Sequence, residues 1–152
     1  MKDTRTINTL NNLIETCKDG EYGFKASADH AVDPQIKSLF MTRAEDCRRA
    51  AAELQTIVMQ QGGKPEDSGT ATGAAHRGWV AVKGTLAGYT DLAMLEETER
   101  GEDTALARYR SALKDELPAD IRSVVEAQMQ GVQRNHDQIR ALRDQHKAAA
   151  TH

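Results

Sequence analysis

The chain has 152 residues, of which 28% are charged and 4% aromatic, and its formal net charge is −3. This size suits one domain whose core is large enough to fold without a disulfide or a metal. The mildly acidic charge argues against a nucleic-acid-binding surface, and the scarcity of aromatic residues argues against single-strand binding by base stacking. No segment reaches the ~20 apolar residues of a membrane span, so no membrane association is expected.

Proline, glycine and helix-capping residues divide the chain into four long helices and one short helix. Asp33 and Pro34 are typical of a helix start, and Pro118 ends one helix before another begins. The short helix surrounds Trp79 and ends at Gly88. The expected long helices span about 4–30, 34–61, 90–116 and 119–147, which makes 1–147 one domain and 148–152 a tail.

Long helices joined by short turns pack antiparallel as a four-helix bundle. One long connection, here between the second and third long helices, is typical of the ferritin-like topology, and a simple up-down bundle is the alternative. No strand pattern occurs in the sequence. The predicted fold class is therefore all-α: a ferritin-like four-helix bundle with an extra short helix before the third long helix.

Each expected long helix carries an apolar stripe at helical spacing, and polar residues interrupt the stripe near its middle. In "LEETERGEDTALARYRSAL" the stripe of Leu95, Leu106 and Tyr109 passes through Glu99 and Glu102. Antiparallel packing would bring these interruptions to one level. The residues predicted to form this polar core layer are Glu21, Arg43, Glu99, Glu102, Gln128, Asn135 and His136.

Carboxylates in a core are costly unless they are paired or bind a metal. Three explanations therefore stay open. The glutamates could hold a metal together with His136, or Arg43 and His136 could pair with them in a metal-free network. Alternatively, the stripes are narrower and some glutamates lie at helix edges in water. The sequence does not decide whether Arg43 or Arg48 enters the core, because one step of helix register exchanges their faces.

Four segments, "LNNLIETCKDGEYGFKASA", "HRGWVAVKGTLAG", "LEETERGEDTALARYRSAL" and "GVQRNHDQIRALRD", resemble a family of bacterial ferritin-like four-helix-bundle proteins of unassigned function. The resemblance covers about residues 6–144. It implies the fold but no established activity. Di-iron members of the wider superfamily use one Glu from each of two helices and a Glu-x-x-His from each of the other two.

Set against that pattern, Glu21 in "DGEYG" and Glu102 in "RGEDT" are similar to the two single glutamates. His136 is similar to a motif histidine, but Gln133 stands in place of its glutamate. The second-helix candidate, "EDCR", ends in Arg48 instead of His. Both Glu-x-x-His motifs are therefore incomplete. The metal that the resemblance implies is at most one divalent ion, Fe or Mn, on Glu21, Glu102 and His136, with Glu99 as a fourth ligand.

The leading hypothesis is a non-enzymatic structural or interaction protein with a metal-free polar core layer, whose network residues are Arg43, Gln128 and Asn135. The alternative is a metal-binding ferritin-like protein, with a degenerate di-iron-type site, in metal or oxidative stress. Whether the chain is an enzyme stays open. Two free thiols and a polar start, "MKDTRTINTL", favour the cytoplasm. Trp79 either packs on the bundle or forms a homodimer contact.

Overall fold

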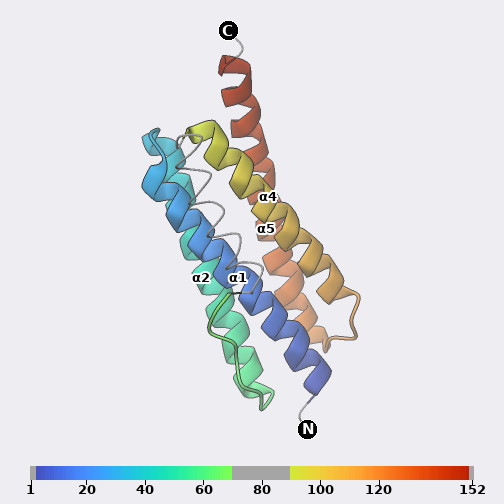
Figure 1. Cartoon of the computed structure of the whole chain (residues 1–152). Coiled ribbons are helices and arrows are strands. Elements are labelled where there is room, and N and C mark those ends of the chain that lie inside the picture. Colours follow the sequence, from blue (N-terminus) through green and yellow to red (C-terminus); the bar gives the residue numbers. More distant parts are fainter. Residues whose placement is uncertain (1–2, 70–89, 151–152) are drawn as a thin grey trace.

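The computed structural model describes residues 3–69 and 90–150, and in them the chain forms four α-helices (Figure 1). Side chains are described through residue 149. The expected short helix and Trp79 lie outside the described residues. The helices are α1 (Thr4–His30), α2 (Pro34–Gln60), α4 (Asp91–Leu113) and α5 (Ala119–Ala150). None of them is long and apolar enough to cross a membrane.

Side-chain caps explain why three of the helices begin where they do. Asp3 accepts hydrogen bonds from the backbone N–H groups of Arg5 and Thr6, and Asp33 accepts one from that of Gln35. The Thr90 hydroxyl accepts one from the N–H group of Ala93. Each of these oxygens satisfies donors that the first helical turn leaves free, so local sequence determines these helix starts.

Two helix ends differ from the expected bounds. The third long helix was expected to reach residue 116, but α4 ends at Leu113. Arg122 explains the early end, since its guanidinium donates hydrogen bonds to the backbone carbonyls of Leu113 and Asp115. The fourth helix was expected to end near Lys147, but α5 continues to residue 150. The added residues are alanines, the best helix formers, so the expected tail begins with three helical residues.

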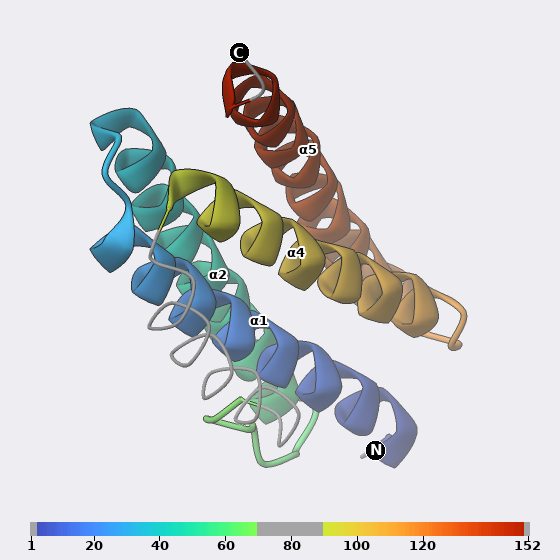
Figure 2. The ribbon, with the colours of Figure 1, turned by 45° about the horizontal axis from the view of Figure 1, so that its top comes forward.

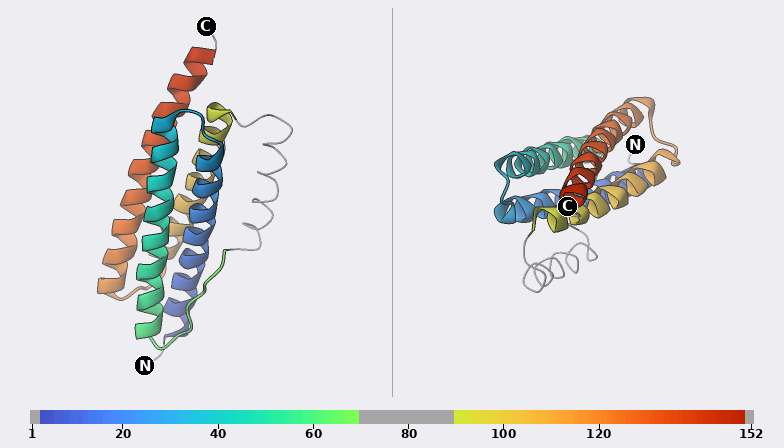
Figure 3. Two further views of the ribbon diagram at one scale, coloured as in Figure 1. Left: turned by 90° about the vertical axis from the view of Figure 1, so that its left-hand side faces the viewer. Right: turned by 90° about the horizontal axis from the view of Figure 1, so that it is seen from above.

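The helices form two antiparallel hairpins, α1–α2 and α4–α5, that lie against each other (Figures 1 and 2). The hairpins meet mainly where α1 packs on α4, whereas α2 and α5 touch at few places. The left view of Figure 3 shows the helices running lengthwise alongside one another. Asp91, at the start of α4, accepts hydrogen bonds from the backbone N–H groups of Val32 and Asp33. This contact fixes the α1–α2 turn to the second hairpin.

The predicted stripes form the core, which divides into two apolar clusters. One contains Leu10, Ile14, Leu54 and Val125, all fully buried, with their neighbours. The other is built around Phe40, together with apolar residues from all four helices. Buried polar side chains of α2, α4 and α5 lie along the same stripes, and they make up the candidate site.

Candidate functional site

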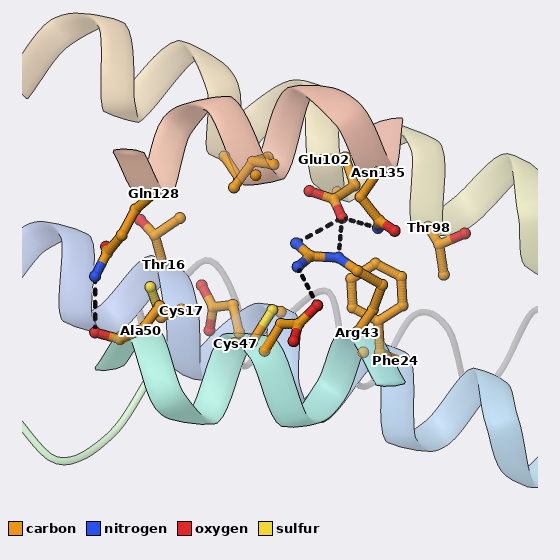
Figure 4. A pocket seen from close by; sticks show the side chains of 18 of the residues that line it. Thr16, Cys17, Phe24, Arg43, Cys47, Ala50, Thr98, Glu102, Gln128 and Asn135 are labelled. Atoms are coloured by element: carbon orange, nitrogen blue, oxygen red, sulfur yellow. Dashed lines mark hydrogen bonds and ion pairs between the residues drawn. The ribbon is translucent and has the colours of Figure 1, made fainter. Parts of the chain in front are cut away.

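A buried arginine joins both hairpins at the centre of the bundle. Arg43 on α2 donates from Nε and Nη2 to Oε1 of Glu102 on α4, at 3.2 and 3.1 Å. Asn135 on α5 donates to the same oxygen at 2.9 Å. The side chains of Arg43 and Glu102 are only 8% and 3% exposed. Figure 4 shows the three residues converging from three helices, which is the charge-paired arrangement that a buried carboxylate needs.

Arg43 has two further partners that hold it in place. Its Nη1 donates to Oδ2 of Asp46 at 3.2 Å, and its guanidinium carbon lies 5.5 Å from the ring centre of Phe24, within cation–π range. Burial raises the pKa of the Glu102 carboxyl, and the charge of Arg43 and the hydrogen bond from Asn135 oppose part of that rise. The guanidinium thus supplies positive charge at the point where the bundle buries its carboxylate.

The choice between Arg43 and Arg48 is settled by their positions on α2. Arg48 is half exposed and bonds Glu45 on its own helix, with Nη2 and Oε1 2.6 Å apart. The hydrogen bonds from Arg48 lower the pKa of Glu45 to about 2. Arg43 therefore enters the core, and Arg48 belongs to the solvated face of α2.

Gln128 belongs to a second polar contact, one that does not touch the arginine. The hydroxyl of Tyr109 donates to Oε1 of Gln128 at 2.8 Å, and Cys17 Sγ lies 3.3 Å from that hydroxyl. Because the hydroxyl has one proton, the thiol is the donor to Tyr109. Gln128 in turn donates to the backbone carbonyl of Ala50 and to Glu53, so this chain also links both hairpins (Figure 4).

Glu21 is separated from the other predicted ligands. Its side chain is 15% exposed, and its carboxylate pairs with Lys18 at 3.8 Å and Lys25 at 3.0 Å. These lysines lie three residues before and four residues after it on the same helix, so the carboxylate is neutralised at the surface. In the described residues Glu21 does not belong to the ligand group that contains Glu99 and His136, and its role as a metal ligand stays a prediction.

Two of the three remaining predicted ligands do meet, in a group that the third, Glu102, does not join. Glu99 and His136 lie with Asp103, and one ligand atom of each falls within 4.8 Å of the others. Asp103 was missed by the sequence analysis because it lies off the apolar stripe, with a side chain 59% exposed. The feature that could have identified Asp103 is its spacing of four residues from Glu99, which places both carboxylates on one face of the helix.

With these contacts in place, the ferritin-type metal centre can be tested against the chain. Two metal ions in a bundle core need several carboxylate and imidazole ligands from facing helices. In the described residues the central layer offers Glu102, and Arg43 and Asn135 already occupy one of its oxygens. No group of ligand atoms in the described residues joins Glu102 to Glu21 or to an imidazole. The residues present do not fit a core di-metal centre.

The family of the chain follows from its sequence. A family model described as a domain of unknown function, DUF2383, matches residues 5–115. The chain belongs to the DUF2383 family. The match covers α1, α2 and α4, and it ends before α5 begins. No curated protein matches the chain with comparable significance.

Solved structures show that this DUF2383 protein has a ferritin-like fold. One is a bacterioferritin-related protein of Bacteroides fragilis, described as a dodecameric thioferritin, with 15% identity and a TM-score of 0.75 over 99% of this chain and 92% of that one. Another is a mutant of Dps1 from Mycobacterium smegmatis, with 14% identity and a TM-score of 0.74 over 92% of this chain and 95% of that one. At such identities the likeness shows the fold alone.

The DUF2383 chain also has a cleft of about 900 Å³ beside the buried ion pair. Residues from all four helices line it, among them Gly23, Arg43, Glu102 and Asn135. The cleft follows from the sparse contact between α2 and α5. Its lining mixes acidic, basic and apolar side chains, so it presents no single chemistry that selects a ligand.

Proposed function

We propose that this protein is a non-enzymatic ferritin-like bundle with a structural or interaction role, in which an internal arginine takes the place of a core metal centre. The observation that carries the proposal is the pairing of Arg43 with Glu102 and Asn135, buried between the hairpins. A cation held by Glu102 would compete with a guanidinium that already supplies positive charge. Such a core supports packing and leaves interactions to the surface.

The test is iron loading of the full chain, purified without a chelator or a histidine tag. We expect no oxygen-dependent oxidation of Fe(II) above the rate without protein, and no bound iron or manganese that is lost in Glu102→Gln. Two metal ions per chain that disappear in this variant, with helicity unchanged, would refute the proposal. Glu45→Gln is the matched control, because Glu45 forms its ion pair on the exposed face of α2.

Self-association is the interaction with the most support. The Bacteroides fragilis relative is described as dodecameric, and Met41 and Met59 on α2 of this chain are large apolar side chains that are mostly exposed. We extend the proposal to a homo-oligomer in the cytoplasm, a dimer or a larger assembly. Light scattering after size exclusion gives the mass directly. A monomer at every concentration up to about 1 mM would contradict this part, because such a limit leaves only very weak association.

A further inference from the structure

We propose that Glu99, Asp103 and His136 form a binding site for one divalent transition-metal ion at the contact between α4 and α5. The two carboxylates lie one helical turn apart on α4, and the imidazole comes from the facing helix. One ligand atom of each residue lies within 4.8 Å of the others. This site is distinct from the arginine-filled core layer, so it goes beyond the proposed function and does not depend on it.

Two buried atoms of the group point to a ligand. Oε2 of Glu99 and Nε2 of His136 are inaccessible to solvent; Oε2 has no hydrogen-bond partner in the described part of the chain, and Nε2 has only its contact with Oδ1 of Asp103, 2.6 Å away. His136 is 2% exposed. Buried polar atoms nearly always have a partner, so an unpartnered carboxylate oxygen of Glu99 in the same group as this buried imidazole needs an explanation. A cation between them would satisfy both at once.

The surroundings of His136 orient its Nε2 atom toward the carboxylates of Glu99 and Asp103. Nδ1 lies 3.3 Å from Oδ1 of Asp137, which also accepts a hydrogen bond from Gln133 at 2.9 Å. With no ion between them, the 2.6 Å contact of Nε2 with Oδ1 of Asp103 requires a proton on Nε2. A metal ion would replace that proton, while an Nδ1–H donates to Asp137. A carboxylate behind a ligating imidazole is the usual arrangement around a protein-bound metal.

Glu99 is oriented in a similar way. Arg143 on α5 donates from Nη1 to Oε1 of Glu99, which leaves Oε2 for a ligand. Arg143 also bonds Asp144, so part of its charge is already balanced. Three carboxylates, on Glu99, Asp103 and Asp137, then surround the imidazole, and two guanidiniums act on them, Arg143 on Glu99 and Arg140 on Asp137. The surplus of negative charge suits a divalent cation.

The ligand types indicate which metals fit. One imidazole nitrogen and two carboxylate oxygens suit Zn(II), Fe(II), Mn(II) or Co(II), whereas Ca(II) and Mg(II) prefer sites made only of oxygen. The exposed side chain of Asp103 gives the ion a path from solvent. Three protein ligands also leave coordination positions for water.

The competing explanation is a metal-free imidazolium held between Asp103 and Asp137.

The experiment titrates Co(II), and then Zn(II) in competition, into chelator-treated and dialysed full-length protein, with visible absorption and calorimetry as readouts. We expect one equivalent of Co(II) to bind with a ligand-field spectrum. Asp103→Asn and His136→Gln should lose the spectrum, and Asp137→Asn should weaken binding by about 10- to 100-fold, as loss of the partner behind a metal-binding imidazole usually does. His146→Gln and Asp120→Asn, both on α5 and outside the group, should bind as the wild type does.

Asp103→Asn keeps the test valid if the buried His136 variant does not fold, because Asp103 is mostly exposed. Circular dichroism checks helicity in each variant. Absence of saturable Co(II) binding up to about 1 mM, which corresponds to about −4 kcal/mol, would overturn the inference. Binding that survives both Asp103→Asn and His136→Gln would overturn it as well. One ion lost with these variants supports this site, whereas two ions lost with Glu102→Gln would instead refute the proposed metal-free core.

Discussion

Replacing Arg43 with methionine removes the positive charge that the core supplies to Glu102. Both side chains of this pair are more than nine-tenths buried, so solvent screens their interaction little. In Arg43→Met the carboxylate keeps only the hydrogen bond from Asn135. Removing one partner of a buried ion pair typically costs about 3–5 kcal/mol in the free energy of unfolding. This loss is a large share of the ~5–15 kcal/mol that stabilises a typical domain.

The cost should depend on pH in a defined direction. Burial raises the pKa of Glu102 above its ordinary value of 4.5, and Arg43 opposes that rise. Without the guanidinium the pKa rises further, so the folded variant binds a proton that the unfolded chain has already released. Its free energy of unfolding then falls as pH increases above 4.5, by about 1.4 kcal/mol per pH unit until the folded-state pKa is passed. The deficit is thus largest at neutral pH and smallest near pH 4.5.

Urea denaturation at several pH values, followed by circular dichroism, measures this deficit as a difference from the wild type. Arg48→Met is the matched control: Arg48 lies on the exposed face of the same helix, and its loss should leave stability nearly unchanged. The double variant Arg43→Met/Glu102→Leu should recover most of the loss, because it removes the unpaired charge as well. Equal effects of Arg43→Met and Arg48→Met, with no pH dependence, would refute the argument.

Other predictions concern packing and the buried thiols. A Cβ at Gly20 would lie 2.9 Å from Sγ of Cys47, whereas a Cβ at Gly23 would meet nothing within 4 Å. In urea denaturation Gly23→Ala should therefore raise the free energy of unfolding by up to about 1 kcal/mol, and Gly20→Ala should not raise it. Tyr109→Phe removes a hydrogen bond to α5 and should cost about 1 kcal/mol in the same assay. Burial raises the pKa of Cys17 to about 11 and that of Cys47 higher, so a disulfide reagent near neutral pH should modify both thiols rapidly only in denaturant.

The fold was predictable because its signals are local. Asp33 with Pro34, and Thr90 before its helix, are cap signals that act within one turn, and the structure has helix starts at both. The apolar stripes were readable because 3-4 spacing is a property of the single helix. The end of α4 could not be predicted from such local signals. Its last carbonyls are satisfied by Arg122, a residue of the next helix, and such a cap depends on how the chain turns.

The candidate site was predictable only in part. Sequence spacing identified Glu99, Glu102 and His136 as side chains near the core, but it did not divide them between two groups. That division depends on which residue of a facing helix lies opposite each one, and helical periodicity does not determine this. Glu21 is absent from the ligand group of Glu99 and His136 in the described residues, and its role as a ligand stays a prediction. Its angular position is at the edge of the stripe, and lysines of its own helix reach it first.

The division of the core has a consequence for motion. Apolar clusters lie in the two halves of the bundle, and the charge pair of Arg43 with Glu102 lies between the hairpins. In a uniformly apolar bundle one hairpin could slide along the other by a helical turn, about 5.4 Å, and exchange one set of leucine contacts for another. Here that step would carry a guanidinium into hydrocarbon. The ion pair therefore opposes sliding of one hairpin along the other. This suits a rigid structural role better than signal transmission by helix sliding.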